Sequence, residues 1–140
     1  MEKIAQMLKE YGLKATFQRM NIVDVIHKMG HADVDEIYQE VIKTHPTLSL
    51  ATVYKNVLVM VEKGALVEVP IAGKKSKFEI KKEDHFHLIC TECGMVVDKE
   101  LDNIVKQDTE KLAKYSGFDL HARQLNLYGV CDTCHHKKAS

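Results

Sequence analysis

The amino-acid sequence predicts an α+β protein in which an N-terminal winged helix-turn-helix domain is followed by a small α/β domain. Helical patterns with capping signals occupy the chain up to residue 63, and two short β-type runs follow them. Beyond the charged segment 81–84 the pattern changes to strands around two C-x-x-C pairs, which contain all four cysteines. We therefore expect one domain at residues 1–82 and a second domain at residues 83–140.

Length, charge and apolar content narrow the class of protein. With 140 residues, of which 45% are hydrophobic, each half has a small core that bound metal or dimerisation would help to stabilise. The formal net charge is zero, so a DNA-binding surface has to be a local patch. We find no apolar run that spans a membrane and no signal-peptide pattern, so we expect a cytoplasmic protein with no membrane partner. In that compartment C-x-x-C pairs usually bind metal or carry redox chemistry.

Two helices are expected before residue 31. Apolar residues recur at helical spacing from Ile4 to Tyr11, and Gly12 is a suitable stop for the first helix. Thr16 can cap the second helix, which should end near Met29-Gly30.

Two more helices complete the helical segment. Asp33 followed by Glu36 gives a capping-box pattern for the third, which we expect to continue until Thr44-His45-Pro46 breaks it. Ser49 can cap a fourth helix over residues 50 to about 63.

A basic-tipped β-hairpin follows the fourth helix. Its strands are the β-type runs 66–69 and 76–80, and the connection between them contains a glycine and two lysines. Helices followed by such a hairpin are the order of a winged helix-turn-helix, in which the last helix enters the major groove and hairpin lysines contact phosphates. The alternative is that the polar residues of the fourth helix and of the hairpin connection are ordinary exposed residues. The candidate DNA contacts are Thr52, Tyr54, Lys55, Asn56, Lys74 and Lys75.

The stretch from His85 to Asp98 concentrates metal-binding side chains. If it begins with a strand, His85 and His87 project from one face, because side chains alternate along a strand. Cys90-x-x-Cys93-Gly94 has the form of a zinc knuckle, since glycine can take the positive φ of a tight turn. A returning strand at 95–98 would bring Asp98 beside the histidines, and the alternative is a pair of surface histidines without metal.

The rest of the second half predicts a helix, a strand and a second C-x-x-C pair. Apolar residues at helical spacing from Leu101 to Leu112 indicate an amphipathic helix. Leu125 and Leu127 alternate in a last strand, which leads to a second knuckle at Cys131-Asp132-Thr133-Cys134.

The four cysteines, Cys90, Cys93, Cys131 and Cys134, predict a structural zinc site. Closed tetrahedral thiolate sites commonly stabilise small domains, and they leave no open position for catalysis. The 37 residues between Cys93 and Cys131 exceed the spacing of a compact zinc ribbon, so buried thiols and a redox switch are alternatives. We find no HExxH motif and expect no enzyme.

Four motifs follow one another along the chain. They are Leu13-Lys14-Ala15-Thr16-x-Gln18-Arg19, Ser49-Leu50-Ala51-Thr52-Val53-Tyr54-Lys55-Asn56, His85-x-His87-x-x-Cys90-x-x-Cys93-Gly94 and Tyr128-Gly129-x-Cys131-x-x-Cys134. Together they resemble the ferric uptake regulator family over essentially the whole chain. The resemblance implies a homodimeric, metal-dependent transcriptional repressor that binds double-stranded operator DNA, with a winged-helix domain and an α/β dimerisation domain. It also adds Arg19 to the DNA-binding candidates and implies structural Zn2+ on the four cysteines.

The resemblance further implies a regulatory site for Fe2+ or Mn2+ at His31, Glu79, His85, His87 and Asp98. These residues come from both domains and the hinge, so a metal bound there would set the spacing of the two recognition helices across the dimer. Metal and DNA would then raise each other's affinity through the same coupling. Three imidazoles and two carboxylates suit Fe(II), Mn(II) or Zn(II) without selecting among them.

The residue types at Asp98 and at a second set of positions resemble those of the peroxide-sensing branch of this family. Asp is typical of that branch at the position of Asp98, whereas iron-uptake regulators typically have Glu there. An extra metal site of many iron-uptake regulators also looks broken, because Asp84, Phe86 and Arg123 occupy its places.

In the peroxide-sensing branch, Fe(II) in the regulatory site reacts with hydrogen peroxide and a ligand histidine is oxidised. By resemblance the oxidation targets are His31 and His85, and an oxidised imidazole is a poorer ligand, so the metal leaves and the dimer releases DNA. Two positions depart from the pattern, because Glu79 stands where the best-known peroxide sensors have Asp and Phe17 replaces a common proline. The alternatives are an iron-responsive uptake repressor of the same family and, from another class, a zinc-containing C-x-x-C thiol redox protein.

Overall fold

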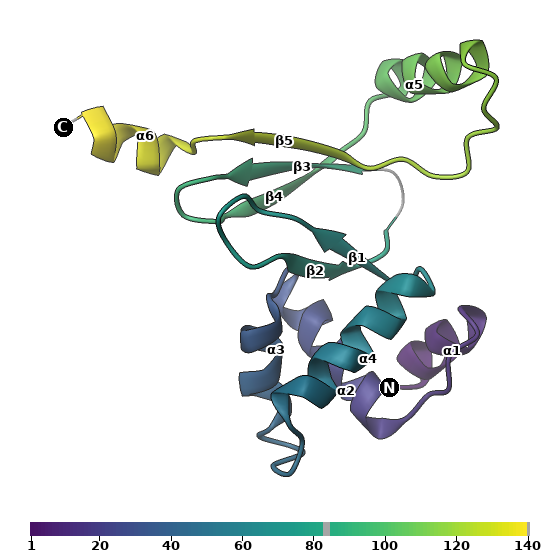
Figure 1. Ribbon diagram of the computed structural model, residues 1–140, viewed down its shortest axis with the longest axis vertical. Coiled ribbons are helices and arrows are strands. Elements are labelled where there is room, and N and C mark those ends of the chain that lie inside the picture. The colour runs from purple at the N-terminus through teal and green to yellow at the C-terminus, as the bar shows by residue number, and fades with distance from the viewer. Residues whose placement is uncertain (83–84, 140) are drawn as a thin grey trace. The chain divides into compact units, whose positions relative to one another are not determined.

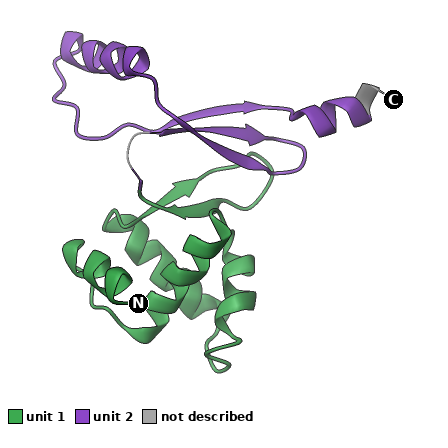
Figure 2. Cartoon of the chain, turned by 180° about the vertical axis from the view of Figure 1, so that it is seen from behind, with its two compact units in different colours: residues 1–81 green, residues 82–140 purple. Residues whose placement is uncertain are grey.

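The structure is a computed structural model that describes residues 1–82 and 85–139 (Figure 1). It divides into two compact units, residues 1–81 and residues 82–140 (Figure 2). Glu83 and Asp84, which belong to the charged segment of the sequence, lie outside the described residues. None of the helices within the described ranges combines the length and apolar character that crossing a membrane requires.

The first unit contains helices and a two-stranded hairpin. One apolar core receives side chains from every element of the unit, among them Leu8, Ile26, Ile37, Val57, Leu66 and Phe78. The elements are α1 (Glu2–Glu10), α2 (Phe17–Met29), α3 (Val34–Val41), α4 (Leu50–Glu62), β1 (Leu66–Val69) and β2 (Lys77–Ile80). This helix-then-hairpin order confirms the architecture predicted for the first half of the chain.

The helix starts follow the predicted capping residues. The Thr16 side chain accepts a hydrogen bond from the backbone of Arg19, which satisfies a free amide of the first turn of α2. Asp33 and Glu36 form the capping box of α3, and Ser49 caps α4. Helix α3 ends at Val41, earlier than the predicted break, and residues 42–44 form turns. Pro46 disfavours the helical conformation at the residue before it, so the chain leaves the helix ahead of this proline.

A backbone bridge joins the start of α3 to the hairpin. Strands β1 and β2 are antiparallel, and Ala32 pairs with Phe78 through two backbone hydrogen bonds of 3.1 and 2.8 Å. The segment before α3 therefore acts as a short third strand beside β2. Because pairing fixes the neighbours on either side, the bridge brings His31 to Glu79.

The second unit is a three-stranded mixed sheet with two helices. Strand β3 lies in the middle, antiparallel to β4 and parallel to β5. The chain reaches β5 through α5, as a parallel pair requires a long connection. The elements are β3 (His85–Cys90), β4 (Val96–Glu100), α5 (Asn103–Tyr115), β5 (Leu125–Gly129) and α6 (Asp132–Ala139). This unit confirms the predicted α/β character of the second half.

The second C-x-x-C pair differs from the predicted knuckle. Cys131 directly precedes α6 and Cys134 lies within its first turn, so a helix start spaces the two thiols. The first pair does follow the prediction, since Gly94 takes a φ of 77° and its amide bonds to the Cys90 carbonyl at 2.9 Å. A C-x-x-C spacing suits both geometries, and the sequence carried no signal that separates them.

Candidate metal centres and DNA-binding surface

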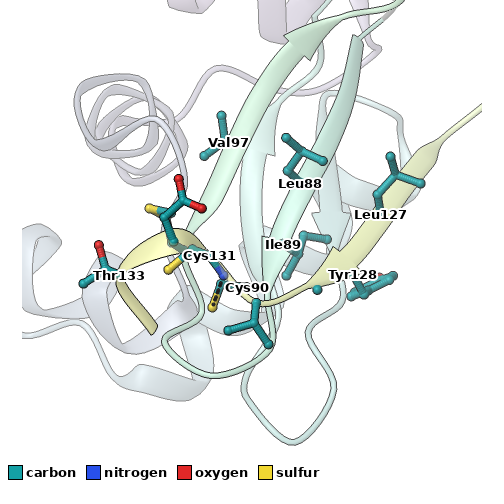
Figure 3. A pocket seen from close by; sticks show the side chains of 12 residues that line it. Leu88, Ile89, Cys90, Val97, Leu127, Tyr128, Cys131 and Thr133 are labelled. Carbon is teal, nitrogen blue, oxygen red and sulfur yellow. Dashed lines mark hydrogen bonds between the residues drawn. The ribbon is translucent and has the colours of Figure 1, made fainter. Parts of the chain in front are cut away.

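The four cysteine side chains of the second unit converge on one point. One ligand atom from each, the Sγ of Cys90, Cys93, Cys131 and Cys134, lies within 4.8 Å of the others. The parallel register sets Cys90 opposite Gly129, and the amide of Thr91 donates to the Gly129 carbonyl at 2.9 Å. This pairing brings the end of β3 to the start of α6, where Cys131 lies beside Cys90 (Figure 3).

The electrostatics of the cluster suit a bound dication. Backbone amides of Cys131 and Cys93 donate to the Cys90 sulfur and lower the pKa of that thiol to about 6. Hydrogen bonding of the Cys134 thiol to the Cys131 sulfur, together with burial, raises the pKa of Cys134 to about 12. The four thiols therefore cannot all ionise without a cation among them, which a metal ion supplies.

The spacing of the sulfurs also fits zinc. Tetrahedral Zn–S bonds of about 2.3 Å imply sulfur–sulfur separations of about 3.8 Å. The Sγ atoms of Cys93 and Cys131 are 3.9 Å apart. Four thiolates within 4.8 Å of one another can together fill a tetrahedral shell and leave no open position, so the cluster fits a structural zinc site.

A second group of metal-binding atoms lies on β3 and β4. His85 and His87 project from the same face of β3, with their Nε2 atoms 3.1 Å apart. The antiparallel register sets His87 opposite Asp98, whose Oδ1 lies 3.3 Å from Nε2 of His87 and 3.9 Å from Nε2 of His85. Two imidazole nitrogens and one carboxylate oxygen therefore face a common point, which is a donor set for Fe(II), Mn(II) or Zn(II).

Two outer contacts hold this group in place. Nδ1 of His87 lies 2.9 Å from Oδ1 of Asn126, and Lys82 donates to Oδ2 of Asp98 at 2.7 Å. Neither residue was predicted from the sequence to take part in the site. Side chains alternate along β5, so Asn126 lies on the opposite face of the strand from Leu125 and Leu127. Only the register of β3 and β5 reveals that Asn126 lies opposite His87.

The first unit carries an imidazole–carboxylate pair. Nε2 of His31 lies 2.7 Å from Oε2 of Glu79, whose side chain is fully buried in the structure. The Ala32–Phe78 bridge produces this contact between two residues that the family resemblance assigns to one site. A buried carboxylate needs a charged or hydrogen-bonding partner, and both side chains offer atoms that bind divalent metals.

The predicted DNA-binding residues of α2 and α4 fall into two groups. Asn56 accepts from Nε of Arg19 at 3.2 Å, and its amide nitrogen donates to the Thr52 carbonyl at 3.0 Å. Asn56 thus has both ends of its amide engaged within the protein. Thr52, Tyr54 and Lys55 are exposed on α4 and can reach a major groove, although the Thr52 hydroxyl also accepts a hydrogen bond from Ser49 at 2.9 Å.

The hairpin lysines differ from each other. Lys75 forms an ion pair with Asp35 of α3, which raises the pKa of Lys75. Lys74 is exposed at the turn. Lys74 forms no ion pair with a carboxylate among the described residues, whereas Lys75 would have to exchange Asp35 for a phosphate.

Comparison with known proteins identifies the family. The model of the ferric uptake regulator family matches residues 10–128. The peroxide operon regulator of Bacillus subtilis is 34% identical over 140 residues, which cover 99% of this chain and 95% of that protein.

Solved structures agree with this match. The Campylobacter jejuni peroxide stress regulator is 36% identical, with a TM-score of 0.77 over 92% of this chain and 97% of that chain. The Vibrio cholerae ferric uptake regulator is 32% identical, with a TM-score of 0.73 over 91% and 98% of the two chains. The resemblance seen in the sequence motifs is thereby confirmed, and the chain belongs to the ferric uptake regulator family.

Proposed function

We propose that this protein is a metal-dependent, homodimeric transcriptional repressor that releases operator DNA in response to hydrogen peroxide. The observation that carries the proposal is the convergence of His85, His87 and Asp98 on one point, in a chain similar to two regulators named for peroxide. A repressor of this kind acts by binding, so the proposal assigns no enzymatic turnover. Its place of action is the cytoplasm, where operator DNA is.

The four cysteines form the structural zinc site in this proposal. Cys90 ends β3 and Cys131 lies two residues beyond the end of β5, so a zinc ion on the four thiolates would fasten these two parallel strands together. The strands in turn carry His87 and Asn126. A closed thiolate site supports folding and takes no part in chemistry.

The regulatory metal, Fe2+ or Mn2+, would be held in this proposal by the five residues predicted from the sequence, His31, Glu79, His85, His87 and Asp98. Because these ligands come from both units, metal binding would favour one arrangement of the units. That preference would link metal binding to the affinity for DNA. The coupling is reciprocal, so operator DNA raises the affinity for the metal.

Fe(II) bound at this site would supply the electrons for reduction of hydrogen peroxide, and the histidine side chains that hold it would be the groups next to that reaction. The side chains of His31 and His85 are 14% exposed, whereas that of His87 is 2% exposed. Peroxide therefore has better access beside His31 and His85, which favours these two as the oxidation targets. An oxidised imidazole binds metal less well, and the repressor loses its DNA-competent arrangement.

DNA binding is assigned to the first unit. Tyr54 and Lys55 on α4 face outward, and Lys74 at the hairpin turn is free to contact a phosphate. Arg19 contributes by holding Asn56, and through it the surface of α4. Lys75 and Thr52 complete the set proposed from the sequence.

Dimerisation is assigned to the second unit. Helix α5 has no buried residue, and Ile104 and Leu112 are each 67% exposed in the single chain. A hollow of about 540 Å³ on this unit is lined largely by apolar side chains, including Leu88, Val97 and Leu127 (Figure 3). Apolar surface on this scale indicates a protein partner, and a second copy would cover it.

Metal-dependent operator binding tests this proposal directly. Zinc-containing protein should bind a labelled candidate operator with Mn(II) present and lose that binding with chelator. Binding of equal strength with and without Mn(II) would refute metal dependence. An iron-responsive repressor is the second candidate, because the Vibrio cholerae ferric uptake regulator is similar over 91% of this chain. Indifference of the iron-loaded complex to peroxide would favour it.

A further inference from the structure

Asn126 contacts the proposed regulatory site without supplying a metal ligand. The parallel register sets it directly opposite His87, and its Oδ1 lies 2.9 Å from Nδ1 of the imidazole. His87 is only 1% exposed, so water has little access to replace this contact. The orientation of the His87 ring thus depends on a side chain from β5.

The chemistry of the contact fixes which nitrogen of His87 can bind metal. An amide oxygen only accepts hydrogen bonds, so with Oδ1 of Asn126 assigned to face the ring, Nδ1 of His87 is assigned the proton and donates it. In a neutral imidazole the other nitrogen then carries the lone pair. That nitrogen, Nε2, is the atom 3.3 Å from Oδ1 of Asp98.

We propose that Asn126 is a positioning residue, which holds the His87 imidazole with Nε2 directed at the regulatory metal. The inference rests on the proposed regulatory site and adds to it a residue outside the ligand set. Ligand histidines generally donate their second ring N–H to an acceptor, which fixes the tautomer and increases the basicity of the ligand atom. Asn126 meets this requirement from the neighbouring strand.

The four-cysteine cluster keeps this pair in register. Three residues after His87, Cys90 ends β3, and Cys131 follows the end of β5. The Cys131 amide lies 3.4 Å from the Cys90 sulfur, and Thr91 bonds to Gly129 across the same two strands. Slippage of β5 by one residue would turn Asn126 away from His87. The structural site thereby supports the regulatory site through the β3–β5 pairing.

Two substitutions separate positioning from packing. Asn126→Leu keeps the size of the side chain and removes the acceptor, whereas Asn126→Asp keeps an acceptor at the same place. With zinc in the four-cysteine site, Asn126→Leu should weaken Mn(II) binding by about 10- to 100-fold, and Asn126→Asp should bind Mn(II) at least as tightly as the wild type. Gln107→Leu, which removes an exposed amide from α5, is the matched control and should leave Mn(II) affinity unchanged.

A second readout does not involve the regulatory metal. Nitrogen-15 NMR of the imidazoles, recorded with only the structural zinc present, should show a proton on Nδ1 of His87 in the wild type and its loss or redistribution in Asn126→Leu. A wild-type His87 protonated only on Nε2 would overturn the inference. So would wild-type Mn(II) affinity in Asn126→Leu accompanied by reduced thermal stability, since that outcome describes a packing role alone.

The two readouts also separate this inference from the proposed function. If the wild type fails to bind Mn(II), the regulatory site is wrong, and the NMR spectrum still decides the contact between Asn126 and His87. If Asn126→Leu does not fold, Asn126→Asp is the deciding variant. This variant keeps an acceptor opposite His87, so a Mn(II) affinity more than about tenfold below that of the wild type would contradict the inference.

Discussion

Oδ1 of Asp98 lies 3.3 Å from Nε2 of His87, because the antiparallel register of β3 and β4 sets the two residues opposite each other. The other oxygen of the same carboxylate accepts a hydrogen bond from Lys82 at 2.7 Å. Asp98 therefore presents one oxygen to the histidines and keeps the other occupied. The arrangement favours a carboxylate that binds a regulatory metal through a single atom.

Replacing Asp98 with Asn should abolish most regulatory metal binding. The substitution keeps the shape of the side chain and removes its charge, so Mn(II) affinity should fall by at least about 100-fold, more than for the usual loss of an outer-shell partner. Mn(II) titration followed by electron paramagnetic resonance measures this. Asp108→Asn on α5 is the control, and an equal loss in both variants would point to general electrostatics.

Replacing Lys82 with Met should strengthen regulatory metal binding. Lys82 places a positive charge on Asp98 and competes with any cation for that carboxylate. The pair is partly exposed, so its removal should raise Mn(II) affinity by no more than about fivefold, which corresponds to about 1 kcal/mol. The same titration detects the change. Weaker binding in Lys82→Met would show instead that Lys82 orients Asp98 for the metal.

Replacing Tyr54 or Lys55 with Ala should weaken operator binding. Both side chains are exposed on α4, and loss of a groove or phosphate contact should lower affinity by about tenfold while metal content stays the same. Fluorescence anisotropy with labelled operator measures the effect. Lys63→Ala, at the far end of the same helix, should bind normally. Wild-type affinity in both Tyr54→Ala and Lys55→Ala would exclude α4 as the recognition helix.

Zinc affinity should fall more steeply with falling pH below about 6, the pKa of the Cys90 thiol without metal, because zinc must then displace a proton from Cys90. Protons compete with zinc for thiolates, and the lowered pKa keeps Cys90 ionised above that value. The thiol of Cys134, with a pKa of about 12, favours its proton across this whole range and adds no step there. The measurement is zinc content after dialysis against chelator at pH 7.5 and pH 5, conditions chosen about one unit or more on either side of that pKa.

One outcome of the zinc experiment would contradict the pH prediction, and another would contradict the structural role. Equal retention at both pH values would show that thiolate protonation does not control the site. Reversible zinc release under mild oxidant at neutral pH, with disulfide formation, would favour the thiol redox protein. His135→Ala, which lies outside the four sulfurs, serves as the control variant.

The sequence predicted the elements of this fold well because their signals are local. Capping side chains at Thr16, Asp33 and Ser49 act within three residues, and the alternation of His85 and His87 follows from strand geometry alone. The helical start at the second C-x-x-C pair was missed, since both a knuckle and a helix turn space two thiols suitably. Local pattern does not separate them.

The contacts that complete the candidate site depend on strand register, which a single sequence does not contain. Asn126 meets His87 only because β5 pairs with β3 at that offset, and His31 meets Glu79 only through the Ala32–Phe78 bridge. The engagement of Asn56 by Arg19 joins two helices far apart in the chain. Each of these pairs links residues many positions apart, and periodicity carries no information on such pairings.

Peroxide treatment of the metal-loaded repressor on its operator tests the central claim most directly. Anaerobic protein with structural zinc intact is loaded with Fe(II) or Mn(II), bound to operator and exposed to low hydrogen peroxide, while DNA release and peptide mass are followed together. We predict DNA release with Fe(II) but not Mn(II), matched by one added oxygen on the peptide containing His31 or His85. Metal-dependent DNA binding that withstands peroxide, with both histidines unmodified, would contradict the account.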